Sequence, residues 1–206
     1  MSLKIPLFMS AKKRAILFSL FAGISTVVVV WILLTSLVSV GRDNSLDNIR
    51  IVIDTKALTL QVLEGDREML VFTEIAIGRY GTSLNRRKGD NKTPLGHFNI
   101  AWITDNTSFH RFFGFSYPSK EYAERAFQAG HLDQKTWDKI RQALASGRLP
   151  PQNTILGGSL GIHGIGQGDI EVHKQYNWTN GCIALTNDQV DILTDWIRIG
   201  TPVEIR

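Results

Sequence analysis

The sequence of 206 residues has a single cysteine, Cys182, so no disulfide can form within the chain. Its five histidines are scattered, and no i, i+4 or Cys-x-x-Cys spacing places two metal ligands together. The glycines at 164–168 are not followed by Lys-Ser or Lys-Thr, which indicates a turn rather than a phosphate-binding loop. The sequence therefore predicts no metal and no cofactor.

Residues 42–206, most of the chain, carry no net charge. Residues 1–41 hold four basic and no acidic residues, which accounts for the whole formal charge of +4. The remainder has 19 basic and 19 acidic residues. A neutral domain has no general electrostatic attraction for a phosphate backbone, so we expect no nucleic-acid partner.

Charged residues are also absent from the apolar run 15–40. As a helix its 26 residues would measure roughly 39 Å, enough to cross a hydrocarbon core of about 30 Å. The basic residues 12–14 precede it, and the positive-inside rule then places the N-terminus in the cytoplasm. We expect a cytoplasmic tail at 1–14, a transmembrane anchor at 15–40 and a linker at 41–48. A signal peptide cleaved near 39–41 is the alternative, although its apolar part usually has about 7–15 residues.

Strand patterns dominate the exported remainder, 49–206. Apolar and polar residues alternate at 49–54 and 58–63, and a third run follows at 70–77. A polar, basic loop at 81–92 leads to another strand at 97–103. These segments predict an antiparallel meander.

A helical period replaces the strand period at 118–148. Asp133 suits the N-cap of a helix whose apolar stripe is formed by Trp137, Ile140 and Leu144. A shorter helix is expected at 119–128. We therefore expect a helical insertion in a β domain.

The last part of the chain returns to strands. Strand signals occur at 160–163 and 181–185, and a final strand includes Val203 and Ile205. A helix is expected at 188–197, with Asn187 or Asp188 as its N-cap.

The lone thiol of Cys182 lies 19 residues after His163. A thiol becomes a useful nucleophile where a base or cation favours the thiolate over its free pKa of about 8.5. His163, flanked by Gly164 at the end of an expected strand, is the candidate base. The backbone N–H groups of Gly181 and Cys182 are candidate donors to an oxyanion.

Other residues near Cys182 have open roles. His173 is a competing base, but the polar run 171–177 reads as a surface loop, which favours a place at the substrate rim. Trp178 is either a substrate platform or part of the core. The aromatic stretch 109–117 either packs under a lid or forms a substrate-binding wall.

Two motifs of this chain together resemble the L,D-transpeptidase family with the YkuD catalytic domain. That family has an Ile-His-Gly strand end and, some twenty residues later, Ser/Thr-x-Gly-Cys; here these are 162–164 and 179–182. Thr-Pro-Leu-Gly at 93–96 and Gly-Thr-Pro-Val at 200–203 are similar to further segments of the family. The resemblance covers residues 49–206.

The resemblance implies a mainly β fold of sandwich or barrel type that acts on peptidoglycan stem peptides. Cys182 would attack the carbonyl of the third residue of a tetrapeptide. His163 would take the thiol proton and return it to the departing D-alanine, and an amine would resolve the acyl-enzyme. Further residues are candidates for substrate binding: Asn180, Thr179, Trp178, Gly164 and His173.

Two positions depart from the pattern of the family. Many members have a histidine where this chain has Asn180, so Cys182 depends on His163 alone for general-base help. Many have an arginine where this chain has Ala184, which leaves open how a substrate carboxylate is held.

Several functions compete with transpeptidation. Water as the acceptor would give a carboxypeptidase or a hydrolase of protein–wall links. A sortase is disfavoured, because sortases separate the two residues much farther and have Thr-Leu-x-Thr-Cys. An inactive peptidoglycan-binding module is disfavoured by the presence of both His163 and Cys182. We expect a single-pass protein of the bacterial cell membrane with its catalytic domain in the periplasm.

Overall fold

The computed structural model describes residues 48–206. The expected tail, the expected anchor and nearly all of the expected linker lie outside the described residues. Within residues 48–206 the structure has no helix with the length and apolar character needed to span a bilayer.

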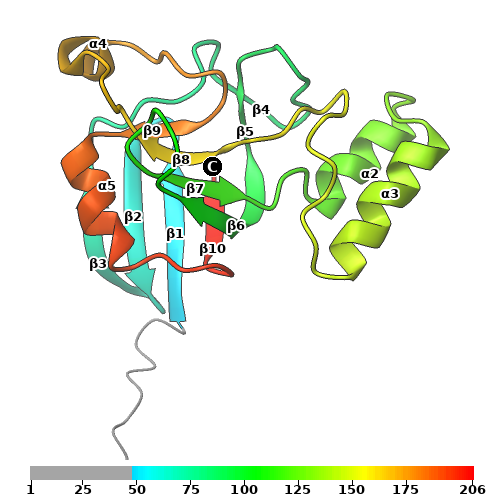
Figure 1. The fold of residues 1–206 in the computed structure, drawn as a ribbon, viewed down its shortest axis with the longest axis horizontal. Coiled ribbons are helices and arrows are strands. Elements are labelled where there is room, and N and C mark those ends of the chain that lie inside the picture. The colour runs from blue at the N-terminus through cyan, green and yellow to red at the C-terminus, as the bar shows by residue number, and fades with distance from the viewer. Residues whose placement is uncertain (1–47) are drawn as a thin grey trace, which may run out of the picture. The chain divides into compact units, whose positions relative to one another are not determined.

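One eight-stranded sheet organises the described part of the chain, in the order β3-β2-β1-β10-β6-β7-β8-β9 (Figure 1). The pairs β1–β10 and β8–β9 are parallel, and the other neighbours are antiparallel. A separate short sheet pairs β4 with β5. The strands are β1 (Ile49–Asp54), β2 (Thr59–Glu64), β3 (Arg67–Phe72), β4 (Thr82–Ser83), β5 (Thr93–Pro94), β6 (Gly96–Thr104), β7 (Phe112–Phe115), β8 (Gly161–Gly164), β9 (Ile183–Leu185) and β10 (Pro202–Ile205).

Strand β6 joins the two halves of the sheet. Its first half pairs with β10, and from Ile100 onward it pairs with β7, with a register shift before Trp102. The far edge, β9, then meets the segment after β3, where Ala76 and Ala184 exchange backbone hydrogen bonds of 3.0 and 2.8 Å. The sheet thus curls back toward its first strands. The expected mainly β fold is confirmed.

The helical insertion forms α2 (Lys120–Gln128) and α3 (Gln134–Ala145). The Asp133 side chain accepts a 2.6 Å hydrogen bond from the Thr136 N–H, as predicted for an N-cap. The ring of Tyr122 on α2 packs edge-on against that of Tyr117, with centroids 5.3 Å apart. Because the side chain of Tyr117 is fully buried, this contact anchors the insertion to the core.

Three local predictions were wrong. The third strand is 67–72 rather than 70–77, because a tight turn pairs Glu64 directly with Arg67. Residues 170–175 form a helix, α4 (Ile170–Gln175), which begins after the N-cap Asp169. Helix α5 (Asn187–Thr194) is capped by Thr186, whose hydroxyl accepts from the Gln189 N–H in a reciprocal capping box.

The aromatic stretch 109–117 divides between the core and the site. Phe113, Phe115 and Tyr117 are fully buried. Phe109 and Phe112 instead line the pocket that contains Cys182. Part of this stretch therefore packs in the core, whereas a substrate-binding role for Phe109 and Phe112 stays a prediction.

Candidate active site

Adjacent parallel strands bring His163 and Cys182 to one pocket. In the register of β8 and β9, His163 lies opposite Ala184, and Cys182 immediately precedes β9. Both residues line a cavity of about 350 Å³. Further lining residues are Arg79, Arg86, Phe109, Phe112, Gly158, Ser159, Leu160, Trp178, Thr179 and Asn180.

Aromatic rings surround the imidazole of His163. Its centroid lies 4.2 Å from that of Phe109, 5.9 Å from that of Phe112 and 5.8 Å from that of Trp178. This burial lowers the pKa of His163 below its ordinary value, although the hydrogen bond to the Gly164 backbone opposes the shift. The imidazole is therefore uncharged at neutral pH, as a general base must be.

The hydrogen bond of His163 also fixes its tautomer. Nδ1 lies 2.7 Å from the carbonyl oxygen of Gly164, which can only accept. Nδ1 therefore carries the proton, and the free lone pair of the neutral ring is on Nε2.

The thiol of Cys182 is partly exposed and packs against the hydrophobic core. It donates a long hydrogen bond of 3.7 Å to the Ser159 carbonyl oxygen. Burial raises the pKa of Cys182 to about 11, while a backbone hydrogen bond from Gly161 and the charge of Arg86 act in the opposite direction. The resting pair is thus a neutral thiol and a neutral imidazole.

The Thr179 hydroxyl braces the turn before the nucleophile. It donates to the Cys182 carbonyl oxygen at 2.7 Å and accepts from the Gly181 N–H at 3.1 Å. The Gly181 N–H is therefore already occupied, contrary to its expected place in an oxyanion site. The Cys182 N–H has no hydrogen bond with any of residues 48–206, and it remains a candidate donor.

Glycine is required at position 181 by two constraints. Its φ is +125°, which side-chain-bearing residues rarely adopt. A Cβ added there would lie 2.6 Å from the Lys92 carbonyl oxygen. The Gly-Cys motif thus reflects the close approach of the 81–92 loop.

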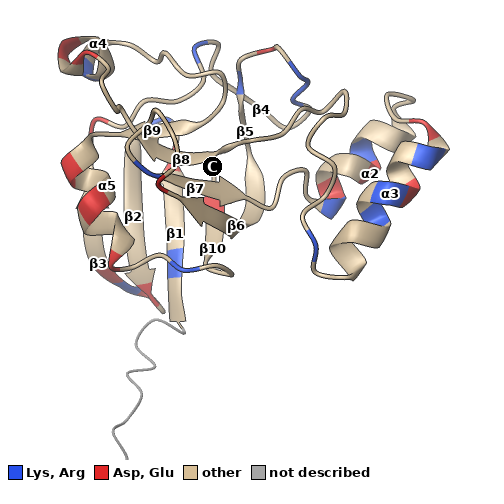
Figure 2. Ribbon diagram, in the orientation of Figure 1, with Lys and Arg blue, Asp and Glu red and all other residues tan. Residues whose placement is uncertain are grey.

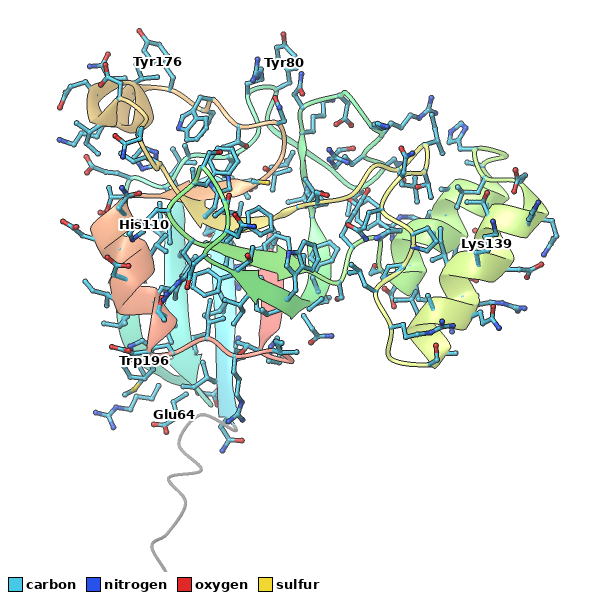
Figure 3. All side chains as sticks on the ribbon, viewed as in Figure 1. Glu64, Tyr80, His110, Lys139, Tyr176 and Trp196 are labelled. Atoms are coloured by element: carbon cyan, nitrogen blue, oxygen red, sulfur yellow. The ribbon has the colours of Figure 1, made fainter. Side chains whose placement is uncertain are left out.

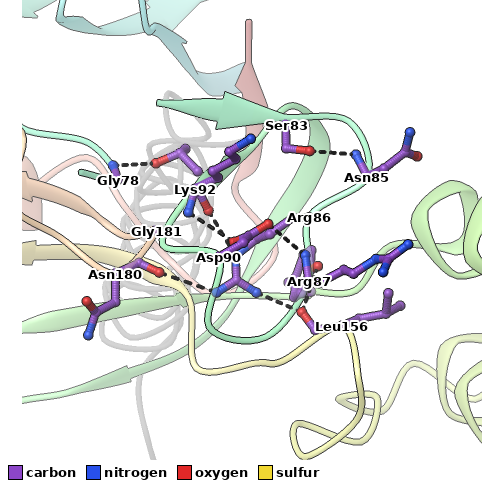
Figure 4. A network of polar contacts seen from close by, with 12 residues as sticks. Gly78, Ser83, Asn85, Arg86, Arg87, Asp90, Lys92, Leu156, Asn180 and Gly181 are labelled. Carbon is purple, nitrogen blue, oxygen red and sulfur yellow. Dashed lines mark hydrogen bonds and ion pairs between the residues drawn. The ribbon is translucent and has the colours of Figure 1, made fainter. Parts of the chain in front are cut away.

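Sequence reasoning missed Arg86, whose side chain is 5% exposed. Its guanidinium donates to the carbonyl oxygens of Lys92, Leu156 and Asn180, at 2.9, 2.7 and 3.3 Å (Figure 4). One buried cation therefore holds three loops around Cys182. Its place in a basic loop was visible in the sequence, but nothing local distinguished it from its exposed neighbours.

Arg79 was missed as well. It is exposed at the pocket, and its Nη2 donates to the Asn180 Oδ1 at 2.8 Å and to the Trp178 carbonyl oxygen at 3.1 Å. Ala184 is fully buried in β9. The described residues thus put the exposed cation of this pocket at position 79 rather than at 184.

His173 is not at the pocket rim, because it is 2% exposed on α4 and does not line the cavity. Its Nδ1 accepts a 3.3 Å hydrogen bond from the Trp178 Nε1. Burial lowers the pKa of His173, partly offset by Glu74. His173 therefore supports the ring that packs against His163.

Gly164 does not line the pocket either. A Cβ there would lie 2.6 Å from the Asn187 Oδ1, so the glycine serves close packing between β8 and α5.

Two exposed tyrosines, Tyr80 and Tyr176, project from the same edge of the domain (Figure 3). Among residues 48–206 no group of three or more His, Cys, Asp or Glu side chains is placed to hold a metal ion.

The fold and pocket can be compared with known proteins. Residues 48–205 match the family model of the YkuD L,D-transpeptidase catalytic domain. Comparison with curated protein sequences finds no match.

Two solved structures are similar to this chain at low sequence identity. The helical cell shape determining protein Pgp2 from Campylobacter jejuni is 18% identical, with a TM-score of 0.52, over 77% of this chain and 47% of Pgp2. Bd1075 from Bdellovibrio bacteriovorus is 18% identical, with a TM-score of 0.49, over 77% of this chain and 48% of that protein. This chain thus spans about half the length of these structures. Because the family model matches most of the sequence, the chain belongs to the L,D-transpeptidase family with the YkuD catalytic domain.

Proposed function

We propose that this chain is a cysteine L,D-transpeptidase that acts on peptidoglycan stem peptides through an acyl-enzyme on Cys182. The observation that carries the proposal is the presence of a thiol and a neutral imidazole in one pocket, beside the paired strands β8 and β9. Membership of the family supports the choice of substrate.

The reaction begins with an uncharged pair. The Cys182 sulfur attacks the carbonyl carbon of the third stem residue as the His163 Nε2 removes the thiol proton. The imidazolium then gives that proton to the nitrogen of the departing D-alanine, and the carbon–nitrogen bond breaks. Because burial raises the thiol pKa to about 11, proton transfer accompanies attack rather than preceding it.

The second half of the reaction restores the enzyme. An amine attacks the thioester carbonyl and loses its proton to His163, and the new amide forms as the thiolate leaves and is reprotonated. The Cys182 N–H supports the oxyanion in both steps, since the Gly181 N–H is held by Thr179. Water in place of the amine gives a carboxypeptidase or hydrolase by the same steps.

Arg79 binds the substrate carboxylate in place of the arginine that many family members have where this chain has Ala184. It is the exposed cation at the pocket, and Asn180 orients its guanidinium. A guanidinium binds a carboxylate in a two-point geometry, which suits the carboxylate of the terminal D-alanine. Asn180, Trp178 and Arg79 together form the substrate-binding side of the proposed site.

We further propose that the domain works outside the cytoplasmic membrane, on the periplasmic side. The apolar run 15–40 and the basic residues 12–14 support this placement. Protease added to spheroplasts whose cytoplasmic membrane is intact should digest the domain. Protection of the domain until the spheroplasts are lysed would oppose the placement.

Mass spectrometry of the full-length protein with a stem tetrapeptide tests the reaction. We expect release of D-alanine and a covalent adduct on Cys182, with both lost in Cys182→Ala and the adduct strongly slowed in His163→Ala. Transfer products with an amine acceptor mark a transpeptidase, and free tripeptide marks a hydrolase. Unchanged D-alanine release by Cys182→Ala would refute the acyl-enzyme.

A further inference from the structure

A second pocket lies between α2 and the loop that joins β4 to β5. Its volume is about 480 Å³, larger than the cavity at Cys182. The basic residues of this loop and of α2 are visible in Figure 2. The pocket is lined by Asn85, Arg86, Arg87, Tyr122, Arg125, Ala126, Gln128, Ala129, His131 and Leu156. None of these described lining residues is acidic, and three of them are arginines.

Arg125, which lines this pocket, has one side-chain donor without a partner. Its Nε is buried and has no hydrogen-bond partner among residues 48–206. Its Nη2 donates to the Leu84 carbonyl oxygen at 3.0 Å, and its guanidinium lies 4.8 Å from the Tyr122 ring centroid. The guanidinium is therefore held in place by two contacts while one N–H stays unsatisfied. A buried donor without a partner is costly, and a ligand that entered the pocket and reached the Nε would supply the missing acceptor.

Arg87 supplies a second cation. Its guanidinium contacts the His131 Nε2, which fixes it without neutralising it. Asp90 lies in the same loop, and its two oxygens accept from the backbone N–H groups of Arg87 and Lys92. Asp90 also lies 3.8 Å from Arg86, so it faces the buried arginine. Among residues 48–206 neither Arg87 nor Arg125 forms a salt bridge, although the charge of Arg125 helps to lower the pKa of Glu121 on the same helix. Both guanidinium groups can therefore bind an anionic ligand.

The basic pocket adjoins the pocket of Cys182 through Arg86. The side chain of Arg86 lines both cavities and forms part of the wall between them. Leu156, Tyr122 and Ala126 give the basic pocket apolar surface beside its cations. A ligand that combines a carboxylate with an apolar or peptide stem fits this mixture better than a bare inorganic anion.

We propose that the basic pocket is a subsite for a carboxylate group of a wall stem peptide, held by Arg125 and Arg87. The identity of the peptide rests on the proposed function, whereas the carboxylate chemistry rests on the pocket alone. The helical insertion then contributes to binding through α2. The carboxylate held here is distinct from the D-alanine carboxylate assigned to Arg79.

Binding to the full-length Cys182→Ala protein in a non-ionic detergent tests the subsite without turnover. The probe is a stem tetrapeptide, and its binding is measured by calorimetry. Adding Arg125→Gln or Arg87→Gln should weaken its affinity by roughly tenfold, because each change removes one charge-assisted contact. The matched control Arg141→Gln, on the solvent-exposed side of α3, should leave affinity unchanged.

Two further arms separate the outcomes. Inorganic phosphate at millimolar concentration should compete weakly with the peptide, and binding of phosphate as tight as that of the peptide would overturn the carboxylate assignment. Arg125→Lys keeps the charge without the Nε donor and should bind between the wild type and Arg125→Gln. Unchanged peptide affinity in Arg87→Gln, a surface change that spares the core, would overturn the subsite. D-alanine release by the wild type is measured separately, so failure of the catalytic proposal is distinguishable.

Discussion

The Arg86 Nη2 donates a hydrogen bond to the Asn180 carbonyl oxygen at 3.3 Å, two residues before Cys182. The same guanidinium holds Lys92 and Leu156. A loop carrying the nucleophile is thereby tied to two loops that are distant in sequence. A buried cation thus acts together with the pairing of β8 and β9 to set the position of the thiol.

Removal of this cation should affect both stability and reactivity. Arg86→Met leaves three carbonyl groups without their donor, and we expect a loss of about 3 kcal/mol in the free energy of unfolding. The thiol pKa should rise, because the charge of Arg86 lowers it, so alkylation of Cys182 at pH 8 should slow. Urea unfolding and iodoacetamide kinetics measure the two effects. Arg87→Met is the control for stability, and an equal loss there would contradict the special place of Arg86.

The aromatic surround of His163 predicts the acid limb of activity. Burial lowers the pKa of His163 below 6.5, so the imidazole stays neutral, and activity persists, as the pH falls somewhat below that value. Phe109→Ala exposes the ring, and its pKa should return toward 6.5. The acid limb then moves to higher pH, with the largest loss of activity near pH 6.

The pH profile of kcat/KM between pH 5 and 8 checks this prediction. Tyr176→Ala removes an exposed aromatic residue that does not line the pocket and should leave the acid limb in place. If the acid limb of Phe109→Ala is unchanged or moves to lower pH, desolvation by Phe109 is not the cause of the lowered pKa of His163.

The sequence predicted much of the framework because its patterns are local. Alternation located β1 and β2, the loop at 81–92 pointed to β6, and the Asp133 cap located α3. Helix α4 was missed because its buried residue is the polar His173, while the apolar Ile170 and Val172 are exposed. Short runs of this kind show no clear period.

Some residues of the site could likewise be found from local patterns, and others could not. His163 and Cys182 were selected from a motif, and strand pairing then brings them to one pocket. Arg79 and Arg86 act through contacts with residues about 90 to 100 positions away in the chain, which no local pattern encodes. The Gly181 N–H was misassigned because its partner is a hydroxyl, Thr179, whose rotamer the sequence does not specify.

Gly181→Ala should disrupt the nucleophile loop through two separable effects. The positive φ costs about 1–2 kcal/mol for any side chain, and the Cβ would also meet the Lys92 carbonyl oxygen at 2.6 Å. Gly130→Ala is the matched control, since its φ is +71° and nothing lies within 4 Å of an added Cβ. We expect Gly181→Ala to lose more stability than Gly130→Ala in thermal unfolding. It should also lower Cys182 acylation by about a hundredfold, because a displacement near 1 Å has that effect on reacting groups. Equal stability losses in the two variants would show that the loop can move aside.

Arg79 should determine selectivity for a substrate with a free terminal carboxylate. The guanidinium is exposed at the pocket and oriented by the Asn180 Oδ1 at 2.8 Å. In Arg79→Gln we expect kcat/KM for D-alanine release to fall by about tenfold to a hundredfold, the loss of one bidentate charge-assisted contact.

A tetrapeptide with an amidated C-terminus separates this role from a structural one. If Arg79 binds the carboxylate, the wild type should discriminate against the amide by a similar factor, and Arg79→Gln should treat the two peptides within about twofold. Asn180→Ala should have a smaller effect, because it loosens the guanidinium without removing its charge. Arg141→Gln, on α3, should retain the wild-type preference. Should Arg79→Gln slow both peptides equally, the residue would be supporting the backbone at Trp178, to whose carbonyl oxygen it also donates, rather than holding the substrate.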